Sequence, residues 1–448
     1  MVEEKSILKT VLFSDFSKWD VKQFFMEQIK SSYPITFLSE LLNEETEKKK
    51  LSKFPNEDFG ILGISNEEGM FDAYTEKGKN INQPYKIIKN DFIAYNPYRV
   101  NVGSIGIKKE HLKNEYISNA YVVFSTKENL LADYLFLLMH TEKFNQLIRD
   151  NTTGSVRQTL SFENLGKIAI PVPSIPEQKA IVQKYQDTIN EVEKLEKEAE
   201  KADKGIDDFI FLKLGIKEVS LEKNNDFILN TTSFSNLYSW DVKHSILNIS
   251  PQTLLKSSLY KNIPVQSVFE INPLTQIPKE IDKITFLPME CISDISGTVI
   301  EKRIIDSKTK GYTKFKDNDV IFAKITPCMQ NGKCAVVKAL LHGYGMGSTE
   351  FHVFRAIKED VLPEFLHSLL RTTMLRRTAM NYFTGSSGQQ RVSSEFIKNL
   401  FIPLPPLPVQ NEIVEHINQI KAQVKDLRQQ AKELREKAKL EFERSVFE

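Results

Sequence analysis

The sequence contains the same pattern twice, and this internal repeat constrains the fold more than any other feature. Both tryptophans of the 448-residue chain stand in one four-residue word, Trp19-Asp20-Val21-Lys22 and Trp240-Asp241-Val242-Lys243. A proline-rich word also occurs twice, at residues 170–182 and 402–414, with seven of thirteen positions identical. Weaker matches keep the same order between these two words. The chain therefore consists of duplicated domains about 225–230 residues apart, not of a solenoid of short repeats.

Each copy begins with a region of mixed pattern. Short apolar runs bounded by Asp, Asn, Gly and Pro predict strands at residues 92–95 and 121–124, and at 320–323 and 351–354 in the second copy. Leucines and phenylalanines at helical spacing predict one helix at about 130–149 and its counterpart at about 362–382. The pattern predicts an α/β or α+β domain.

Two proline-rich segments then lead into two long helices. Proline suits the first turn of a helix, and heptads follow each segment. The apolar seam residues are Ile189, Val192, Leu195, Ala199, Ala202, Ile206, Phe209 and Ile210 in the first helix, and Ile413, Ile417, Ile420, Val424, Leu427, Ala431, Leu434 and Ala438 in the second. We expect the helices to pair as an antiparallel coiled coil, because each starts at its own domain. A surface helix lying on its own domain is the alternative.

These elements predict four regions. They are a first globular domain at 1–173, a central helix at 174–214, a linker and second globular domain at 215–405, and a C-terminal helix at 406–448.

This order of elements resembles the specificity subunit of type I restriction–modification enzymes. The resemblance rests on Thr153-Gly154-Ser155 and Thr384-Gly385-Ser386, and on the Pro-x-Pro-x-x-Pro-x-x-Gln words and long helices that follow them. Phe286-Leu-Pro-Met-Glu290 also resembles a word of its recognition domains, whereas the first copy reads Ile61-Leu-Gly-Ile-Ser65.

The resemblance implies that each globular domain is a target-recognition domain. Each would read one half of a bipartite site in double-stranded DNA, while the helices act as a spacer and dock two methyltransferase (modification) subunits. Restriction subunits, which are translocase–nucleases, would join this core. The specificity subunit itself does no chemistry, so S-adenosylmethionine, ATP and Mg²⁺ are expected on the partner subunits.

The chain shows no catalytic constellation of its own. Asn96-Pro97-Tyr98 lacks the second proline of an adenine methyltransferase word, and Asp317-Asn-Asp319 with Lys324 is only loosely similar to a nuclease motif. Three cysteines without a CxxC pair predict no zinc site and a reducing compartment. No apolar run of about 18 residues and no signal peptide is present. We therefore expect no metal, no membrane association and a cytoplasmic protein.

A net charge of +1 means that contacts with DNA phosphates must be local. Arg, Lys, Asn and Gln read base edges, and two kinds of loop carry them in both copies. The loops after the predicted strands supply Tyr95, Asn96, Tyr98, Arg99 and Asn101, and Lys324, Thr326, Gln330, Asn331 and Lys333. The Thr-Gly-Ser loops supply Ser155, Arg157 and Gln158, and Ser386, Gln389, Gln390 and Arg391. The helix before the second loop adds a basic face of Arg371, Arg376 and Arg377, which is expected to contact phosphates. Solvated polar loops or shared structural turns are the alternative.

Two other functions remain open at this point. One is the recognition subunit of a type IIB-like nuclease–methylase, and the other is a coiled-coil scaffold without a DNA role.

Overall fold

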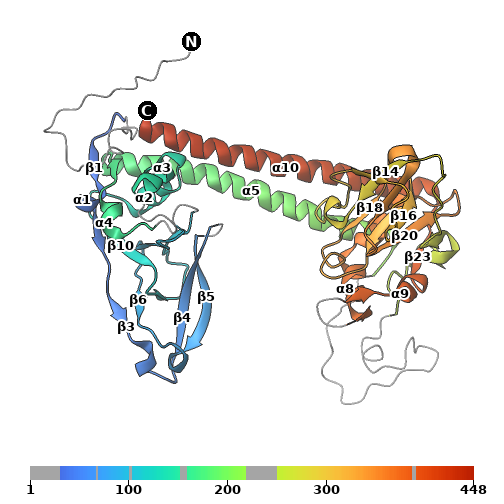
Figure 1. Cartoon of the computed structure of the whole chain (residues 1–448), viewed down its shortest axis with the longest axis horizontal. Coiled ribbons are helices and arrows are strands. Elements are labelled where there is room, and N and C mark those ends of the chain that lie inside the picture. The colour runs from blue at the N-terminus through green and yellow to red at the C-terminus, as the bar shows by residue number, and fades with distance from the viewer. Residues whose placement is uncertain (1–30, 67–68, 100–102, 152–158, 218–249, 386–389) are drawn as a thin grey trace, which may run out of the picture. The chain divides into compact units, whose positions relative to one another are not determined.

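The computed structural model describes residues 31–66, 69–99, 103–151, 159–217, 250–385 and 390–448. The two tryptophan words of the repeat lie outside these residues. The chain divides into two compact units, the first made of Met1–Leu195 and Gln430–Glu448 and the second of Glu196–Gln429. Each unit contains one globular domain and parts of two long helices (Figure 1).

The same four-stranded antiparallel sheet lies in each globular domain. Its order is β2-β10-β7-β8 in the first domain and β13-β20-β17-β18 in the second. The apolar runs predicted as strands form the two middle strands, because both faces of these strands are covered. The strands are β2 Leu42–Glu44, β10 Val122–Thr126, β7 Ile93–Tyr95, β8 Ile105–Ile107, β13 Phe269–Ile271, β20 Phe351–Ala356, β17 Val320–Ala323 and β18 Cys334–Val336.

A second sheet also repeats, with order β3-β6-β9-β4-β5 in the first domain and β16-β19-β14-β15 in the second. Each contains one parallel pair, β4 with β9 and β14 with β19, and the first domain has the additional edge strand β3. The strands are β3 Lys48–Lys49, β6 Tyr85–Ile87, β9 Tyr116–Ser118, β4 Asp58–Ser65, β5 Gly69–Lys77, β16 Thr313–Lys316, β19 Tyr344–Gly347, β14 Lys283–Leu287 and β15 Arg303–Asp306.

Short elements complete both domains, and some of them recur in both copies. A two-stranded pair closes each domain where the proline-rich word leaves it, β1 with β11 and β12 with β23. The remaining strands and short helices are β1 Ile35–Phe37, β11 Ala169–Pro171, β12 Asn262–Pro264, β23 Phe401–Pro403, β21 Phe383–Thr384, β22 Arg391–Val392, α1 Leu38–Leu41, α4 Phe162–Gly166 and α9 Ser394–Lys398.

The helix predicted at 130–149, like that at 362–382, is in fact two helices. These are α2 Ala132–Met139 and α3 Glu142–Asn151, and α7 Pro363–Arg371 and α8 Thr373–Asn381. The breaks fall at Thr141 and Thr372, whose buried hydroxyls donate to the carbonyls three residues earlier, at 2.7 and 2.8 Å. This side-chain bond competes with helical geometry, which hydrophobic spacing alone does not reveal.

A carboxylate from a long helix bonds the first N–H after each break. The Glu142 N–H donates to Glu443, and the Thr373 N–H donates to Asp207, both at 2.7 Å. Because the N–H groups at a helix start have no partner within the helix, each carboxylate satisfies one of them.

The two long helices are α5, Ile175–Leu214, and α10, Leu407–Phe447. All of the heptad positions predicted as a seam are buried or half-buried. In the first unit Lys184 of α5 pairs with Glu441 of α10 at 3.0 Å, and in the second unit Phe209 of α5 stacks on His416 at 4.0 Å between ring centres. Residue numbers fall along α10 as they rise along α5, so the predicted antiparallel pairing is confirmed (Figure 1).

Each domain core also contains the end of the helix that leaves the other domain. Phe442 and Val446 of α10 are buried among Tyr134, Leu135 and Leu138 in the first unit. In the second unit the α5 residues Ile210, Phe211 and Leu214 join the core around β17 and α7. Burial of these side chains contributes about 1.5–3 kcal/mol each, so the helix ends stabilise the domains that they enter.

Candidate nucleic-acid interface

In the second domain the structure brings together the two predicted recognition loops. The loop after β17 lies against β22: Thr326 N–H donates to Gln390 O at 3.0 Å, and Val392 N–H donates to Lys324 O at 2.9 Å. Ile325 and Arg391 form a β-bridge between them. Residues 324–326 and 390–392 therefore lie side by side, and the exposed and half-exposed residues of 324–333 and 390–391 are the candidate surface of the second domain.

Arg391 on this surface is held by a carboxylate. Its guanidinium donates twice to Glu350, with both N–O distances 2.9 Å, and hydrogen bonds from Arg391 lower the pKa of Glu350. The pair is bidentate and geometrically fixed. The Glu350 carboxylate therefore fixes the direction of the Arg391 guanidinium and neutralises part of its charge.

The first domain brings the corresponding segments together. Leu160 follows the first Thr-Gly-Ser loop, and its N–H donates to Pro97 O at 3.1 Å. In the loop after β7, the Asn96 side chain accepts the Tyr98 N–H at 3.0 Å and the Asn96 carbonyl accepts the Arg99 N–H at 3.0 Å. This turn leaves Tyr98 60% exposed and Arg99 exposed, so both side chains are available for contacts.

The prediction of a DNA contact is wrong for Tyr95. Its side chain is 0% exposed, its ring packs edge-on against Phe124, and its hydroxyl donates to Leu160 O at 3.2 Å. Tyr95 belongs to β7 and points into the core, where it ties the two segments of the candidate surface together.

The prediction also needs correction for Arg376. Its guanidinium points inward and donates to the carbonyls of Arg371 at 3.0 Å and Gln330 at 2.6 Å, and burial lowers its pKa. The next residue, Arg377, is exposed. Of this arginine pair, only Arg377 presents its side chain to solvent as phosphate contacts require.

Of the other predicted residues, some have one hydrogen bond or none through their side chains, and some lie outside the described residues. Lys333 Nζ donates to Met289 O at 3.0 Å, whereas Asn331 is exposed. The remaining candidates fall in gaps of the described chain, and they are Asn101, Ser155, Arg157, Gln158, Ser386 and Gln389.

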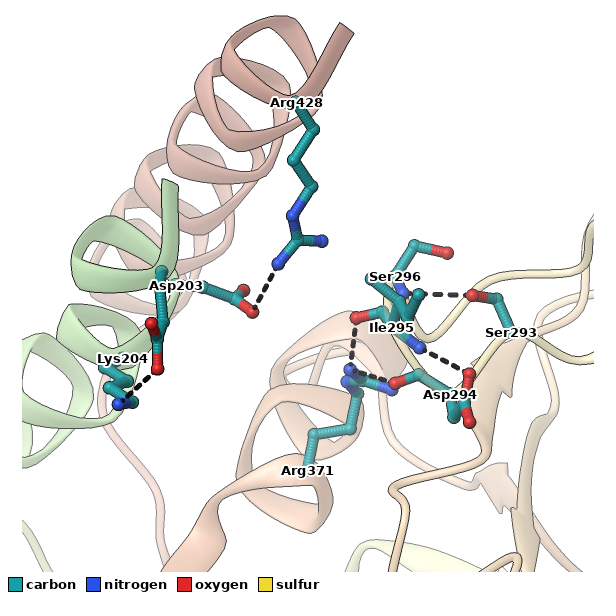
Figure 2. A network of polar contacts seen from close by, with 9 residues as sticks. Asp203, Lys204, Ser293, Asp294, Ile295, Ser296, Arg371 and Arg428 are labelled. Carbon is teal, nitrogen blue, oxygen red and sulfur yellow. Dashed lines mark hydrogen bonds and ion pairs between the residues drawn. The ribbon is translucent and has the colours of Figure 1, made fainter. Parts of the chain in front are cut away.

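Arg371, expected on the same basic helix face as Arg376 and Arg377, is half-buried and bonds a neighbouring turn together with half-buried Lys421, which the sequence did not single out. Arg371 donates to the carbonyls of Asp294 and Ile295 at 3.0 and 2.9 Å (Figure 2), and Lys421 of α10 donates to Ser296 O at 3.0 Å. Burial lowers the pKa of both groups, that of Lys421 to about 8, with their mutual repulsion adding to the effect for Lys421. The turn at 293–297 is thus fastened to α7 and α10. Gly297 leaves room for the guanidinium, because an added Cβ there would lie 2.4 Å from Arg371.

The acidic residues considered for nuclease chemistry have structural partners. Asp319 is 1% exposed and accepts two hydrogen bonds from Arg355, at 2.9 and 2.6 Å. Within the described residues, no three His, Cys, Asp or Glu side chains gather as a metal site would require. In the same part of the chain, no helix is both long and apolar enough to cross a membrane.

Two copies of one domain, with matching polar loops and a pair of long helices, define a duplicated protein suited to binding two related sites. A family profile described as the type I restriction modification DNA specificity domain matches residues 34–202 and 258–436. The chain belongs to this family.

Three known proteins show the similarity. The EcoAI specificity subunit of Escherichia coli is 36% identical over 35% of this chain, and the EcoEI specificity subunit of Escherichia coli is 35% identical over 34%. The matched segments span only 27% and 26% of those two relatives. A solved structure from work on complex assembly and conformational transition of the type I R-M system covers 94% of this chain and 98% of its own chain, with a TM-score of 0.56 and 16% identity. At that identity the likeness supports the fold alone.

Proposed function

We propose that this chain is the sequence-specific DNA-recognition subunit of a type I restriction–modification complex. Each globular domain reads one half of a bipartite site in double-stranded DNA, and α5 and α10 set the distance between the halves. Two methyltransferase subunits dock on the helices, and restriction subunits join them in the cytoplasm. The observation that carries the proposal is the duplication of one candidate surface, the loop after β7 or β17 against the segment ending at Leu160 or Val392. The proposed role is non-catalytic and assigns S-adenosylmethionine, ATP and Mg²⁺ to the partner subunits.

The test compares methylated sites in cells with and without the gene, and in a complex reconstituted with a type I methyltransferase subunit from the same cells. We expect methylation at one bipartite sequence that disappears without this chain. The purified chain alone should neither methylate nor cleave DNA. Unchanged methylation after deletion would contradict the proposal and favour a coiled-coil scaffold, and cleavage by a fused methylase partner would favour a type IIB-like complex.

A second experiment tests the independence of the two readers. Replacing residues 1–170 with the first domain of another family member should change one half-site and leave the other. Because Phe442 and Val446 enter the first domain core, the donor must carry compatible apolar residues at the positions of Tyr134 and Leu138. A folded chimera that changes both half-sites would contradict independent reading.

A further inference from the structure

The loop after β17 is held in one conformation by its own main chain. Met329 N–H donates to Ile325 O and Asn331 N–H to Pro327 O, both at 3.0 Å. Lys333 N–H donates to Cys328 O at 3.0 Å, and Gly332 N–H donates to Met329 O at 2.9 Å. None of these bonds involves the carbonyls of Gln330 and Gly332, whose partners lie outside the loop.

Two arginines supply those partners. Arg376 donates to Gln330 O at 2.6 Å, and Arg371 donates to Gly332 O at 2.5 Å. Arg371 also bonds the 293–297 turn (Figure 2), and Arg376 Nε bonds Arg371 O, so both guanidiniums are fixed at several points. Gly332 has φ +82°, and an added Cβ would lie 3.2 Å from Arg376, so glycine suits this close approach.

Asn331 is the residue between the two bonded carbonyls. Its side chain is exposed, and among the described residues no group bonds its amide. An Asn amide can donate and accept at once, which matches the N6 amino group and N7 of adenine in the major groove. A main chain fixed on both sides of Asn331 lowers the cost of ordering its side chain on binding.

We propose that Asn331 is a specificity-determining residue that reads an adenine, and that Arg371 and Arg376 are positioning residues that hold it. This inference rests on the proposed function and deepens it for the second domain. The first domain has no such arginines: His140 and Asn145 occupy the equivalent positions, counted from the matching Thr141 and Thr372. His140 bonds Phe136 O of its own helix at 2.8 Å, so among the described residues the two arginine contacts have no counterpart at these positions of the first domain.

The experiment uses the full chain in its methyltransferase complex, with the site first mapped by methylation. Binding is then measured on duplexes that carry the mapped site and on every single-base variant of the second half-site. Asn331→Ala is expected to reduce the preference for A at one base pair by about tenfold to a hundredfold. Arg376→Gln is expected to relax the same base pair, although it does not touch the DNA.

Arg377→Gln is the matched control, because it removes the same charge from the adjacent exposed position. It should weaken binding to all sequences alike and reduce the dependence on salt, as loss of a phosphate contact does. Arg376→Lys keeps the charge without the planar fork and should lose part of the preference. If Arg376→Gln does not fold, as shown by thermal melting, Asn331→Ala and Arg376→Lys decide the question.

Parental base preference in the Asn331→Ala complex overturns the reading role. If the Asn331→Ala complex loses its base preference but the folded Arg376 variants keep the parental preference, the positioning role is overturned. A parental complex with no defined methylated site contradicts the proposed function itself, which is a separate outcome.

Discussion

Gln178 and Gln410 make the same three hydrogen bonds in the two halves of the chain. Each side-chain oxygen accepts the N–H of the residue before a domain helix, Leu131 at 2.8 Å and Leu362 at 2.9 Å. Each amide nitrogen donates to two main-chain carbonyls at 2.8–3.0 Å. Both side chains are 0% exposed. A buried glutamine thus joins the first turn of each long helix to its own globular domain.

Replacing either glutamine should destabilise the domain that it contacts. Gln178→Ala leaves one N–H and two carbonyls buried without this partner, so we expect a loss of about 2–4 kcal/mol in the free energy of unfolding. Gln410→Ala should have a similar effect on the second domain. Denaturant unfolding of the full chain measures both, and exposed Gln183→Ala, one turn further along α5, should change stability by less than about 0.5 kcal/mol. Equal effects of Gln178→Ala and Gln183→Ala would contradict this role.

The end of α10 should stabilise the first domain specifically. Phe442 is 4% exposed and contacts Tyr134 and Tyr185, with ring centres 6.1 and 6.0 Å apart. Phe442→Ala should cost about 3–5 kcal/mol, because it leaves a cavity in that core. Hydrogen exchange should rise in α2 and α3 but not in α7 and α8. Leu440→Ala is the control on the same helix, since Leu440 is 56% exposed, and faster exchange in both domains for Phe442→Ala would argue against the prediction.

Acid should destabilise the second domain through His367. Burial, together with the positive charges of Lys421 and Arg371, lowers the pKa of this imidazole to about 3. An unfolded histidine has a pKa of about 6.5, so between pH 6.5 and 3 the unfolded chain binds a proton that the folded chain does not. The free energy of unfolding should therefore decrease as the pH is lowered from 6.5 to 3. His367 should contribute up to about 1.4 kcal/mol of this decrease per pH unit.

His367→Gln tests this, because glutamine can still donate to Gly297 O, which His367 Nε2 contacts at 2.9 Å. The pH dependence of unfolding in that window should become shallower than that of the parent. An identical slope for His367→Gln and the parent would show that the imidazole charges in the folded state.

The length of α5 should determine the spacer of the DNA site. Duplicating Glu196-Lys-Glu-Ala199 adds four residues and about 6 Å of helix. DNA rises about 3.4 Å per base pair, so the unread spacer should lengthen by one or two base pairs while both half-sites keep their sequences. Coiled coils accommodate such insertions as stutters. Mapping methylated sites for variant and parent measures the change, and a folded, active variant with the parental spacer would show that the helix does not set the distance.

The repeat, the central strands and the two helices were predictable because each leaves a periodic pattern in the sequence. Breaks at Thr141 and Thr372 were not, since they depend on a hydroxyl bond and on carboxylates from distant helices. The contact between the segment after β7 or β17 and the segment at Leu160 or Val392 depends on the tertiary fold, and so does the direction of single side chains. Tyr95 and Arg376 look like surface residues in sequence, and only the tertiary fold supplies the core and the carbonyls that they meet.

Because the terminal turns of α5 and α10 lie in each other's domain cores, neither repeat is self-sufficient. A gene that acquires a new first half by recombination still supplies Phe442 and Val446 from its old second half. An incoming first domain can fold only if its core residues pack against this inherited helix end. Residues around Tyr134 and Leu138 should therefore vary little among hybrids that fold, whereas the exposed residues of the loops after β7 and β17 lie outside this core and are free of this constraint.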